Sequence, residues 1–272
     1  MKSKNKQIYQ SNFSENRLVF HKTKAEYWIN QMCNWLFCNE ADFASIEFFE
    51  LKEMELQQIL TELFADEKIN QPAACAELFF EKCSAIYQKL VLDLDAILEF
   101  DPAATSKNEI IITYPGFFAI VVHRIAHELM HIKSRILARF IAEYAHSKTG
   151  IDIHPSAIIG ENFFIDHGTG IVIGATTVIG KNVKIYQGVT LGALNVSKAD
   201  AEIKRHPTLE DHVIIYANAT ILGGETTIGH HSIIGGNVWI TNSIPPYSMV
   251  FHKSEISIKS KNTFPEALNF SI

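Results

Sequence analysis

The chain has 272 residues, enough for one large or two modest domains, and 47% hydrophobic with 20% charged residues is typical of a globular protein with a sizeable core. Lys and Arg total 24 against 30 Asp and Glu, a net charge of −6, and there is no long basic run. This balance excludes a protein built to bind nucleic-acid phosphates. No apolar stretch approaches the roughly 20 residues of a membrane span, so we expect no membrane association.

The first residues and the cysteines bear on the cellular compartment. Residues 1–16 are polar and lack the apolar segment of a secretory signal. The four cysteines lie in the first third of the chain and lack the CxxC spacing of a zinc or redox motif. We therefore expect reduced thiols on the helices of a cytoplasmic protein.

Up to residue 150, glycine and proline are scarce and apolar residues recur at helical spacing. The pattern predicts amphipathic helices over 25–37, 43–64, 73–98 and 116–147. Pro115 suits a helix start, Gly150 suits a helix stop, and Asp101-Pro102 predicts a turn between the third and fourth helices. Residues 1–150 are thus predicted to form a helical N-terminal domain.

After residue 150 a six-residue period replaces the helical one. Aliphatic residues recur at every sixth position, as at Ile173, Ile179, Ile185 and Leu191, and glycine follows several of them, as at Ile173, Ile179 and Leu191. One aliphatic side chain per short strand would point into a narrow core, and coils stacked about 4.8 Å apart would bury a continuous column. Such repeats predict a parallel β-helix over residues 151–246, whereas a β-sandwich would show period-2 alternation.

The repeat is interrupted where loops are expected to leave the column. The spacing between Ile165 and Ile173 is eight rather than six, and residues 192–207 are polar without any repeat, which predicts an extruded loop. Insertions in a solenoid map to loops that often form the binding face. Pro245-Pro246 is predicted to end the repeat, leaving residues 247–272 as a C-terminal tail.

His167 lies in the first of these interruptions and is the leading candidate for catalysis. Asp166 precedes it, Asp152 opens the first coil, and Arg205-His206 closes the extruded loop. A histidine oriented by a carboxylate can remove a proton from a hydroxyl, because the carboxylate fixes the tautomer and stabilises the imidazolium. A lone histidine is more often structural, so the spacing alone leaves that role open.

Two other histidine patterns suggest zinc. Residues 127–131 spell HExxH on a predicted helix, which would place two imidazoles on one face. That helix is predicted to continue to residue 147 without a turn that brings a third ligand, so a packing helix is the simpler interpretation. His212 and His230, 18 residues apart, could stack across one coil, but exposed turn residues explain them equally well. We expect no metal.

The helical first half, the sixfold repeat and four motifs together resemble bacterial serine O-acetyltransferase. The motifs are Asp152-Ile153-His154-Pro155, Asp166-His167-Gly168-Thr169-Gly170, Val189-Thr190-Leu191-Gly192 and Arg205-His206-Pro207. The match is strong from about residue 101 to residue 246. The repeat alone indicates only the hexapeptide-repeat acyltransferase superfamily, whereas D-H-x-T-G followed by R-H-P is more specific. The resemblance implies an α+β fold: an all-α domain followed by a left-handed parallel β-helix.

The resemblance also implies a reaction, the transfer of acetyl from acetyl-CoA to the hydroxyl of L-serine, which gives O-acetylserine, the precursor of cysteine. In this family the residue at His167 is the general base and the one at Asp152 orients it. The expected substrate-binding residues are Asp101, Pro102, Asp166, Arg205 and His206, the aspartates for serine's ammonium and the last two for its carboxylate. Acetyl-CoA, a co-substrate rather than a resident cofactor, would lie between neighbouring columns near Gly192, Ala193, Ala217 and Gly235.

The chain departs from the family where acetyl-CoA is expected to dock. The loop over 193–204 lacks the usual glycines, Tyr216 and Asn218 stand where glycine is common, and the usual G-x-P-A segment after Pro246 is absent. The two alternatives are an acetyltransferase for a sugar or another hydroxyl acceptor, and a non-catalytic scaffold.

The resemblance further implies partners. The expected assembly is a homotrimer or a dimer of trimers, because a site that needs a groove and a partner's loop requires threefold packing. Family members often end in an isoleucine that enters the active site of O-acetylserine sulfhydrylase, and Ile272 stands at the end of this sequence. A free carboxylate with an aliphatic side chain is a recognised form of C-terminal capture.

Overall fold

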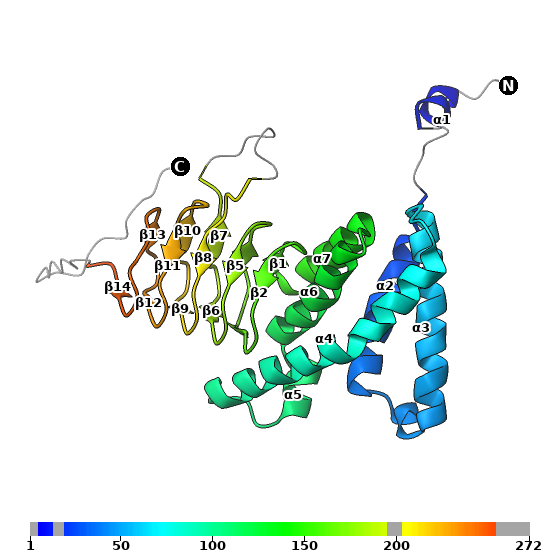
Figure 1. The fold of residues 1–272 in the computed structure, drawn as a ribbon, viewed down its shortest axis with the longest axis horizontal. Helices are drawn as coiled ribbons and strands as arrows, with labels where there is room; N and C mark the ends of the chain where they lie inside the picture. Colours follow the sequence, from blue (N-terminus) through cyan, green and yellow to red (C-terminus); the bar gives the residue numbers. More distant parts are fainter. Residues whose placement is uncertain (1–4, 13–18, 195–202, 254–272) are drawn as a thin grey trace, which may run out of the picture.

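The computed structural model describes residues 5–12, 19–194 and 203–253, so Ile272 and its expected sulfhydrylase contact lie outside the described residues. A helical region comes first and a column of short strands follows it (Figure 1). The helices are α1 (Lys6–Asn12), α2 (Lys22–Phe37), the 3-10 turn η1 (Ala41–Ala44), α3 (Ile46–Asp66), α4 (Pro72–Phe100), α5 (Lys107–Thr113), α6 (Pro115–His131) and α7 (Arg135–Thr149).

The strands are two or three residues long and follow one another down the column. They are β1 (Asp152–Ile153), β2 (Ile158–Ile159), β3 (Phe164–Asp166), β4 (Val172–Ile173), β5 (Val178–Ile179), β6 (Lys184–Tyr186), β7 (Thr190–Gly192), β8 (Thr208–Leu209), β9 (Ile214–Ile215), β10 (Thr220–Leu222), β11 (Thr227–Ile228), β12 (Ile233–Ile234), β13 (Trp239–Ile240) and β14 (Met249–Val250).

From β1 to β13 every third strand belongs to the same sheet, so the chain winds as a three-sided coil. Within the described residues, face A has the order β1-β4-β7-β10-β13, face B has β11-β8-β5-β2, and face C has β14-β12-β9-β6-β3. All pairs are parallel, and the register places Ile153 beside Ile173 and Ile173 beside Leu191, which are all buried. The sixfold period therefore lines up one aliphatic column, and the predicted helical domain followed by a parallel β-helix is confirmed.

The repeat continues beyond the point where it was predicted to end. Met249 pairs with Ile233 and Val250 with Ile234, so β14 adds another strand to face C after Pro245-Pro246. The prolines lie in a corner, where no ladder N–H is needed, and the N–H of Ser248 donates to Ser232 Oγ at 3.1 Å. The prediction that these prolines end the repeat is wrong, because a corner tolerates residues that a strand does not.

The fourth predicted helix is two helices, α6 and α7. Lys133 adopts the left-handed conformation with φ of 67°, and its N–H donates to the Met130 carbonyl and closes α6. Glu67, at the end of α3, accepts hydrogen bonds from Ser134 Oγ at 2.6 Å and from the Leu137 N–H at 2.7 Å. A carboxylate distant in sequence thus caps the first turn of α7, and no glycine marks the break.

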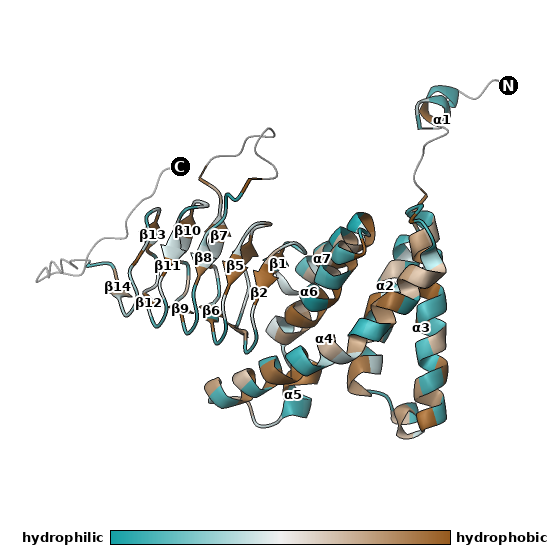
Figure 2. Cartoon of the chain, in the orientation of Figure 1, coloured by the Kyte–Doolittle hydropathy of each residue, from teal (hydrophilic) through white to brown (hydrophobic). Residues whose placement is uncertain are grey.

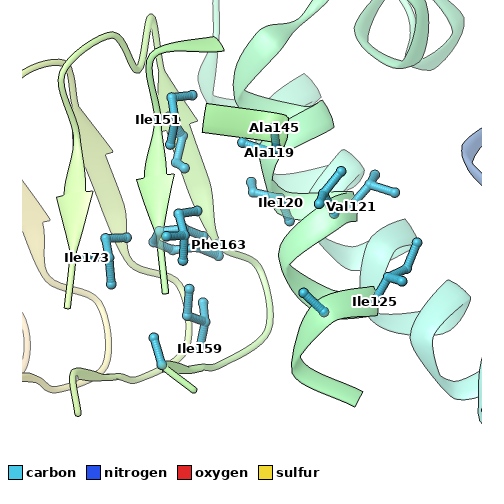
Figure 3. Close-up of a cluster of buried hydrophobic side chains, with 14 of the residues drawn as sticks. Ala119, Ile120, Val121, Ile125, Ala145, Ile151, Ile159, Phe163 and Ile173 are labelled. Carbon is cyan, nitrogen blue, oxygen red and sulfur yellow. The ribbon is translucent and has the colours of Figure 1, made fainter. Parts of the chain in front are cut away.

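Helices α4, α6 and α7 pack against the first coils of the column, through β1 and β3. In Figure 2, α3 and α4 carry alternating hydrophilic and hydrophobic positions. Figure 3 shows Ala119 and Ile120 of α6 facing Ile151 and Phe163 at the first coil, and all four are buried. The helical region therefore covers the end of the aliphatic column that would otherwise meet water.

A buried ion pair ties this contact together. Arg124 of α6 donates to Asp93 of α4 from Nε at 2.5 Å and from Nη2 at 2.8 Å, and the two side chains are 5% and 0% exposed. Arg124 Nη2 also donates to the Gly160 carbonyl at 2.8 Å, and Asp93 accepts from the Phe163 N–H at 2.9 Å. One arginine and one aspartate thus link two helices to one corner of the first coil.

In the part of the chain that the structure describes, no single helix has the length and apolar character of a membrane span. Only α5 and α6 taken together reach that length, and they are bent by 79° where they meet.

Candidate active site

His167 stands on the corner between β3 and β4. It adopts the left-handed conformation with φ of 55°, and Gly168 and Gly170 follow with φ of 83° and 82°. A Cβ on Gly168 would lie 2.4 Å from Ile151 Cδ1, so only glycine fits there. This tight corner directs the His167 side chain outward, where it is 70% exposed.

A hollow of about 580 Å³ opens beside this corner, between the helical region and the column. Its lining comes from the turn after α4, from the start of α6 and from the His167 corner: Asp101, Ala103, Thr113, Tyr114, Pro115, Gly116, Ile165, Asp166, His167 and Thr169. Gly116 lets the start of α6 approach β3, since a Cβ there would lie 2.8 Å from the Ile165 carbonyl oxygen. The fold thus brings Asp101, 66 positions earlier in the sequence, to the same hollow as His167.

Two carboxylates and one imidazole dominate the chemistry of this hollow. Asp166 Oδ1 lies 3.7 Å from His167 Nδ1, within ion-pair range. Asp101 is held at both oxygens, by the Ala103 N–H at 2.8 Å and by the Tyr114 hydroxyl at 2.7 Å. The hydrogen bond to Asp101 raises the pKa of Tyr114 to about 12, so Tyr114 stays a donor. The hollow therefore combines a base with two groups that attract a cation.

Tyr114 was not found by sequence reasoning. It directly precedes the proline that starts α6 and reaches back 13 positions to Asp101. Its position before a helix-starting proline was the one local signal, and that signal indicates a helix boundary rather than a site.

The structure does not bring Asp152 to His167 by a direct contact. Asp152 is half-buried on β1, where it pairs with Val172 on the far side of the same corner. Among the interactions of the described residues, none joins its carboxylate to the His167 ring. The orienting role of Asp152 stays a prediction. Pro102 lies exposed in the turn after α4, next to Asp101.

The remaining predicted residues are divided between two corners of the column. Ala217 and Gly235 lie on the corner between faces C and A, below His167, and the Asn237 N–H donates to the Ala217 carbonyl at 3.0 Å. Gly192 ends β7, and Ala193, Arg205 and His206 belong to the loop at the corner between faces A and B. A single column therefore presents the predicted base and the predicted carboxylate-binding pair on different edges.

The HExxH helix has a structural role in this fold. His127 Nδ1 donates to the Pro155 carbonyl at 2.8 Å and so joins α6 to the first corner of face A, and burial lowers the pKa of His127. Contrary to expectation, the helix ends at His131. His212 stacks on His231 with ring centroids 4.5 Å apart, while His230 pairs with Glu210. Over the described residues, no three His, Cys, Asp or Glu side chains are placed to hold a metal ion.

Two histidines near the extruded loop make stability depend on pH. Burial lowers the pKa of both His154 and His206 to about 4, whereas an unfolded histidine titrates near 6.5. Between these values the unfolded chain binds more protons, so the stabilisation is complete above about pH 6.5 and is lost as the pH falls toward 4.

We expect the free energy of unfolding, measured in urea, to decrease steadily from pH 7 to pH 4.5. A variant with both His154→Gln and His206→Gln should show a shallower dependence. Equal slopes in the variant and the unaltered protein would contradict the assignment to these two residues.

No family model matches the chain. The chain is 50% identical over 191 residues to the plasmid serine acetyltransferase of Synechococcus elongatus. The matched residues cover 68% of this chain and 59% of that protein, so the chain spans less than two thirds of the relative's length. The structure of serine acetyltransferase isoform 3 from Entamoeba histolytica in complex with cysteine is 34% identical with a TM-score of 0.74, over 94% of this chain and 92% of that one. That of Neisseria gonorrhoeae serine acetyltransferase in complex with serine is 28% identical with a TM-score of 0.60, over 83% and 95%.

The helical region followed by a parallel β-helix is the fold that this chain shares with these structures, and the proteins named there are acetyltransferases. The chain belongs to the serine acetyltransferase family.

Proposed function

We propose that the chain transfers acetyl from acetyl-CoA to the hydroxyl of L-serine and forms O-acetyl-L-serine. The hollow at His167 carries this proposal, because Asp101 and Asp166 face the same space as an exposed imidazole. The Neisseria structure holds serine and the Entamoeba structure holds cysteine, two amino acids that share an ammonium and a carboxylate. Two carboxylates around a base suit such a substrate better than a neutral sugar.

The chemistry assigned to each residue follows from its charge and position. His167 accepts the proton of the serine hydroxyl as that oxygen attacks the thioester carbonyl, and then returns the proton to the departing thiolate. Asp101 and Asp166 bind the ammonium group, and the Tyr114 hydroxyl fixes the Asp101 carboxylate. The roles of the other residues are those that the resemblance to the family implies: Arg205 and His206 bind the substrate carboxylate, and Asp152 orients His167.

The division of the predicted residues between two corners supports a homotrimer. His167, Ala217 and Gly235 of one copy would face the loop of the next copy, with acetyl-CoA between the columns near Gly192 and Ala193. We expect light scattering to give the mass of a trimer or of two trimers. An active monomer would contradict this assembly.

Mixed trimers give a sharper test of the shared site. The His167→Ala and His206→Ala variants are each expected to be inactive, but subunit exchange between them should restore part of the activity, because some interfaces then hold an intact residue from each copy. Unrestored activity in confirmed mixed trimers would place both residues in one copy's site.

The acceptor is tested by measuring thiol release from acetyl-CoA with L-serine, L-homoserine and simple sugars. We expect kcat/KM to be highest for L-serine, since only an α-amino acid with a short side chain uses both charged groups and the base together. A higher value for a sugar would support the other hydroxyl-acceptor class.

A scaffold without activity would not need to bind acetyl-CoA. Binding to the folded state raises the melting temperature, so a shift with acetyl-CoA supports the enzyme and an unchanged temperature supports the scaffold.

The thiols Cys33, Cys38, Cys75 and Cys83 are all free, which supports a reducing compartment such as the cytoplasm.

A further inference from the structure

Thr176, on the corner that follows β4, forms hydrogen bonds with the end of the extruded loop. Its hydroxyl oxygen accepts hydrogen bonds from the Arg205 N–H at 2.9 Å and from the His206 N–H at 3.1 Å. Lys204 Nζ donates to the Thr176 carbonyl at 2.9 Å and to the His206 carbonyl at 2.7 Å. Three consecutive loop residues are therefore held at the corner that follows β4.

The same residue fixes the tautomer of His206. The Thr176 N–H lies 3.1 Å from His206 Nδ1, and an amide can only donate, so Nδ1 must accept. The Thr176 Oγ1 lies 2.8 Å from the same nitrogen and is free to donate to it, because its lone pairs already receive two N–H groups. The neutral ring consequently carries its proton on Nε2 and presents an N–H donor there.

Gly174 provides the space in which the ring lies. A Cβ on Gly174 would come within 1.9 Å of His206 Cδ2 and 2.1 Å of Nε2. Real side-chain atoms do not approach so closely, so any larger residue at position 174 would displace the imidazole. Thr176 thus holds one edge of the ring while Gly174 leaves room for the other.

We propose that Thr176 is a positioning residue that sets the place and the donor atom of His206, and with it the backbone of Arg205, for binding the carboxylate of the acceptor. The inference rests on the proposed function, in which Arg205 and His206 bind that carboxylate. Thr176 acts through His206 and is not itself assigned a contact with substrate.

Two substitutions at Thr176 distinguish the effect of its hydroxyl group from the effect of its branched shape. Thr176→Val keeps the branched shape and removes the hydroxyl, whereas Thr176→Ser keeps the hydroxyl. We expect Thr176→Val to raise KM for L-serine about 10- to 100-fold, because loss of a hydrogen bond to a charged group weakens binding by about one to two orders of magnitude, with KM for acetyl-CoA unchanged. Thr176→Ser should restore KM for L-serine to within about threefold of the unaltered protein.

The neighbouring residue provides a matched control. Thr177 is fully buried, and its Oγ1 has no hydrogen-bond partner among the described residues. Thr177→Val should therefore leave KM for L-serine unchanged. If Thr176→Val behaves like Thr177→Val, or if Thr176→Ser is as impaired as Thr176→Val, the proposal is overturned.

An NMR titration of His206 tests the proposal without measuring activity. Lys204 and Arg205 are the cations that face the ring, and His154 lies close enough to interact with it. Burial is the main cause of the low pKa of His206, so release of the ring from its place in Thr176→Val should raise that pKa from about 4 toward its ordinary value, whereas Thr176→Ser should leave it unchanged. An unchanged pKa in Thr176→Val overturns the positioning role. If the pKa rises in a protein that does not acetylate L-serine, the positioning stands and the proposed function fails.

Discussion

Replacing His167 with alanine is expected to lower kcat for serine acetylation by roughly two to four orders of magnitude, the usual contribution of a positioned base. The fold should survive, because the ring is 70% exposed. Its backbone is in the left-handed region, which asparagine tolerates better than alanine, so His167→Asn removes the base with less strain. Both variants should lose similar activity in a steady-state assay while their melting temperatures show how much strain alanine adds.

His131→Ala is a suitable control for this experiment. His131 is also an exposed histidine, at 60%, but it lies at the end of α6 and completes the HExxH pattern. We expect the activity of His131→Ala to match that of the unaltered protein. Near-normal activity of His167→Asn would remove His167 from the role of base, and a large loss in His131→Ala would revive a function for the HExxH segment.

Replacing Arg124 with methionine is expected to destabilise the protein by about 3–5 kcal/mol, because the substitution leaves the Asp93 carboxylate buried without its cation. The carbonyl of Gly160 loses its donor as well. Urea denaturation at pH 7 measures the loss. Should Arg124→Met yield no folded protein, Asp93→Asn offers a milder test, since it retains a hydrogen-bonding side chain and removes the charge.

The pair formed by Arg139 and Glu143 provides the matched control. It also joins a guanidinium to a carboxylate, with Arg139 Nη2 2.6 Å from Glu143 Oε1, but the two side chains are 43% and 50% exposed. Exposed pairs of this kind contribute about 0.3–0.5 kcal/mol, so Arg139→Met should change the free energy of unfolding very little. A similar small loss in both variants would mean that the buried pair contributes no more than an exposed one.

The fold was predictable because its repeats are local. A six-residue period with glycine at the corners has few solutions other than a coil of short parallel strands, and the sheets confirm it. The break at Lys133 was not predictable, because the carboxylate that stabilises it comes from Glu67, 66 positions earlier. The strand after Pro246 was missed because the hydroxyl of Ser232 compensates for the irregular corner.

The candidate site was predictable in part. The residues Asp101, Asp166 and His167 line one hollow, although no spacing in the sequence indicated that the turn after α4 would reach β3. Tyr114 lacked any local signal of function, and its contact with Asp101 depends on how α6 begins. The separation of Arg205 and His206 from His167 was not predictable either, because the corner on which each residue lies follows from the winding of the coil and not from a local pattern.

Both ends of the extruded loop are fixed to the column. β7 ends at Gly192 and β8 begins at Thr208, yet Thr208 pairs in register with Val178 as though no residues intervened. With Lys204, Arg205 and His206 fastened to the column, residues between these anchor points can be lengthened or exchanged at little cost, since each doubling of a loop's length adds only about 0.6 kcal/mol of closure entropy. The register of the strands on either side of the loop therefore does not depend on the length of the segment between them.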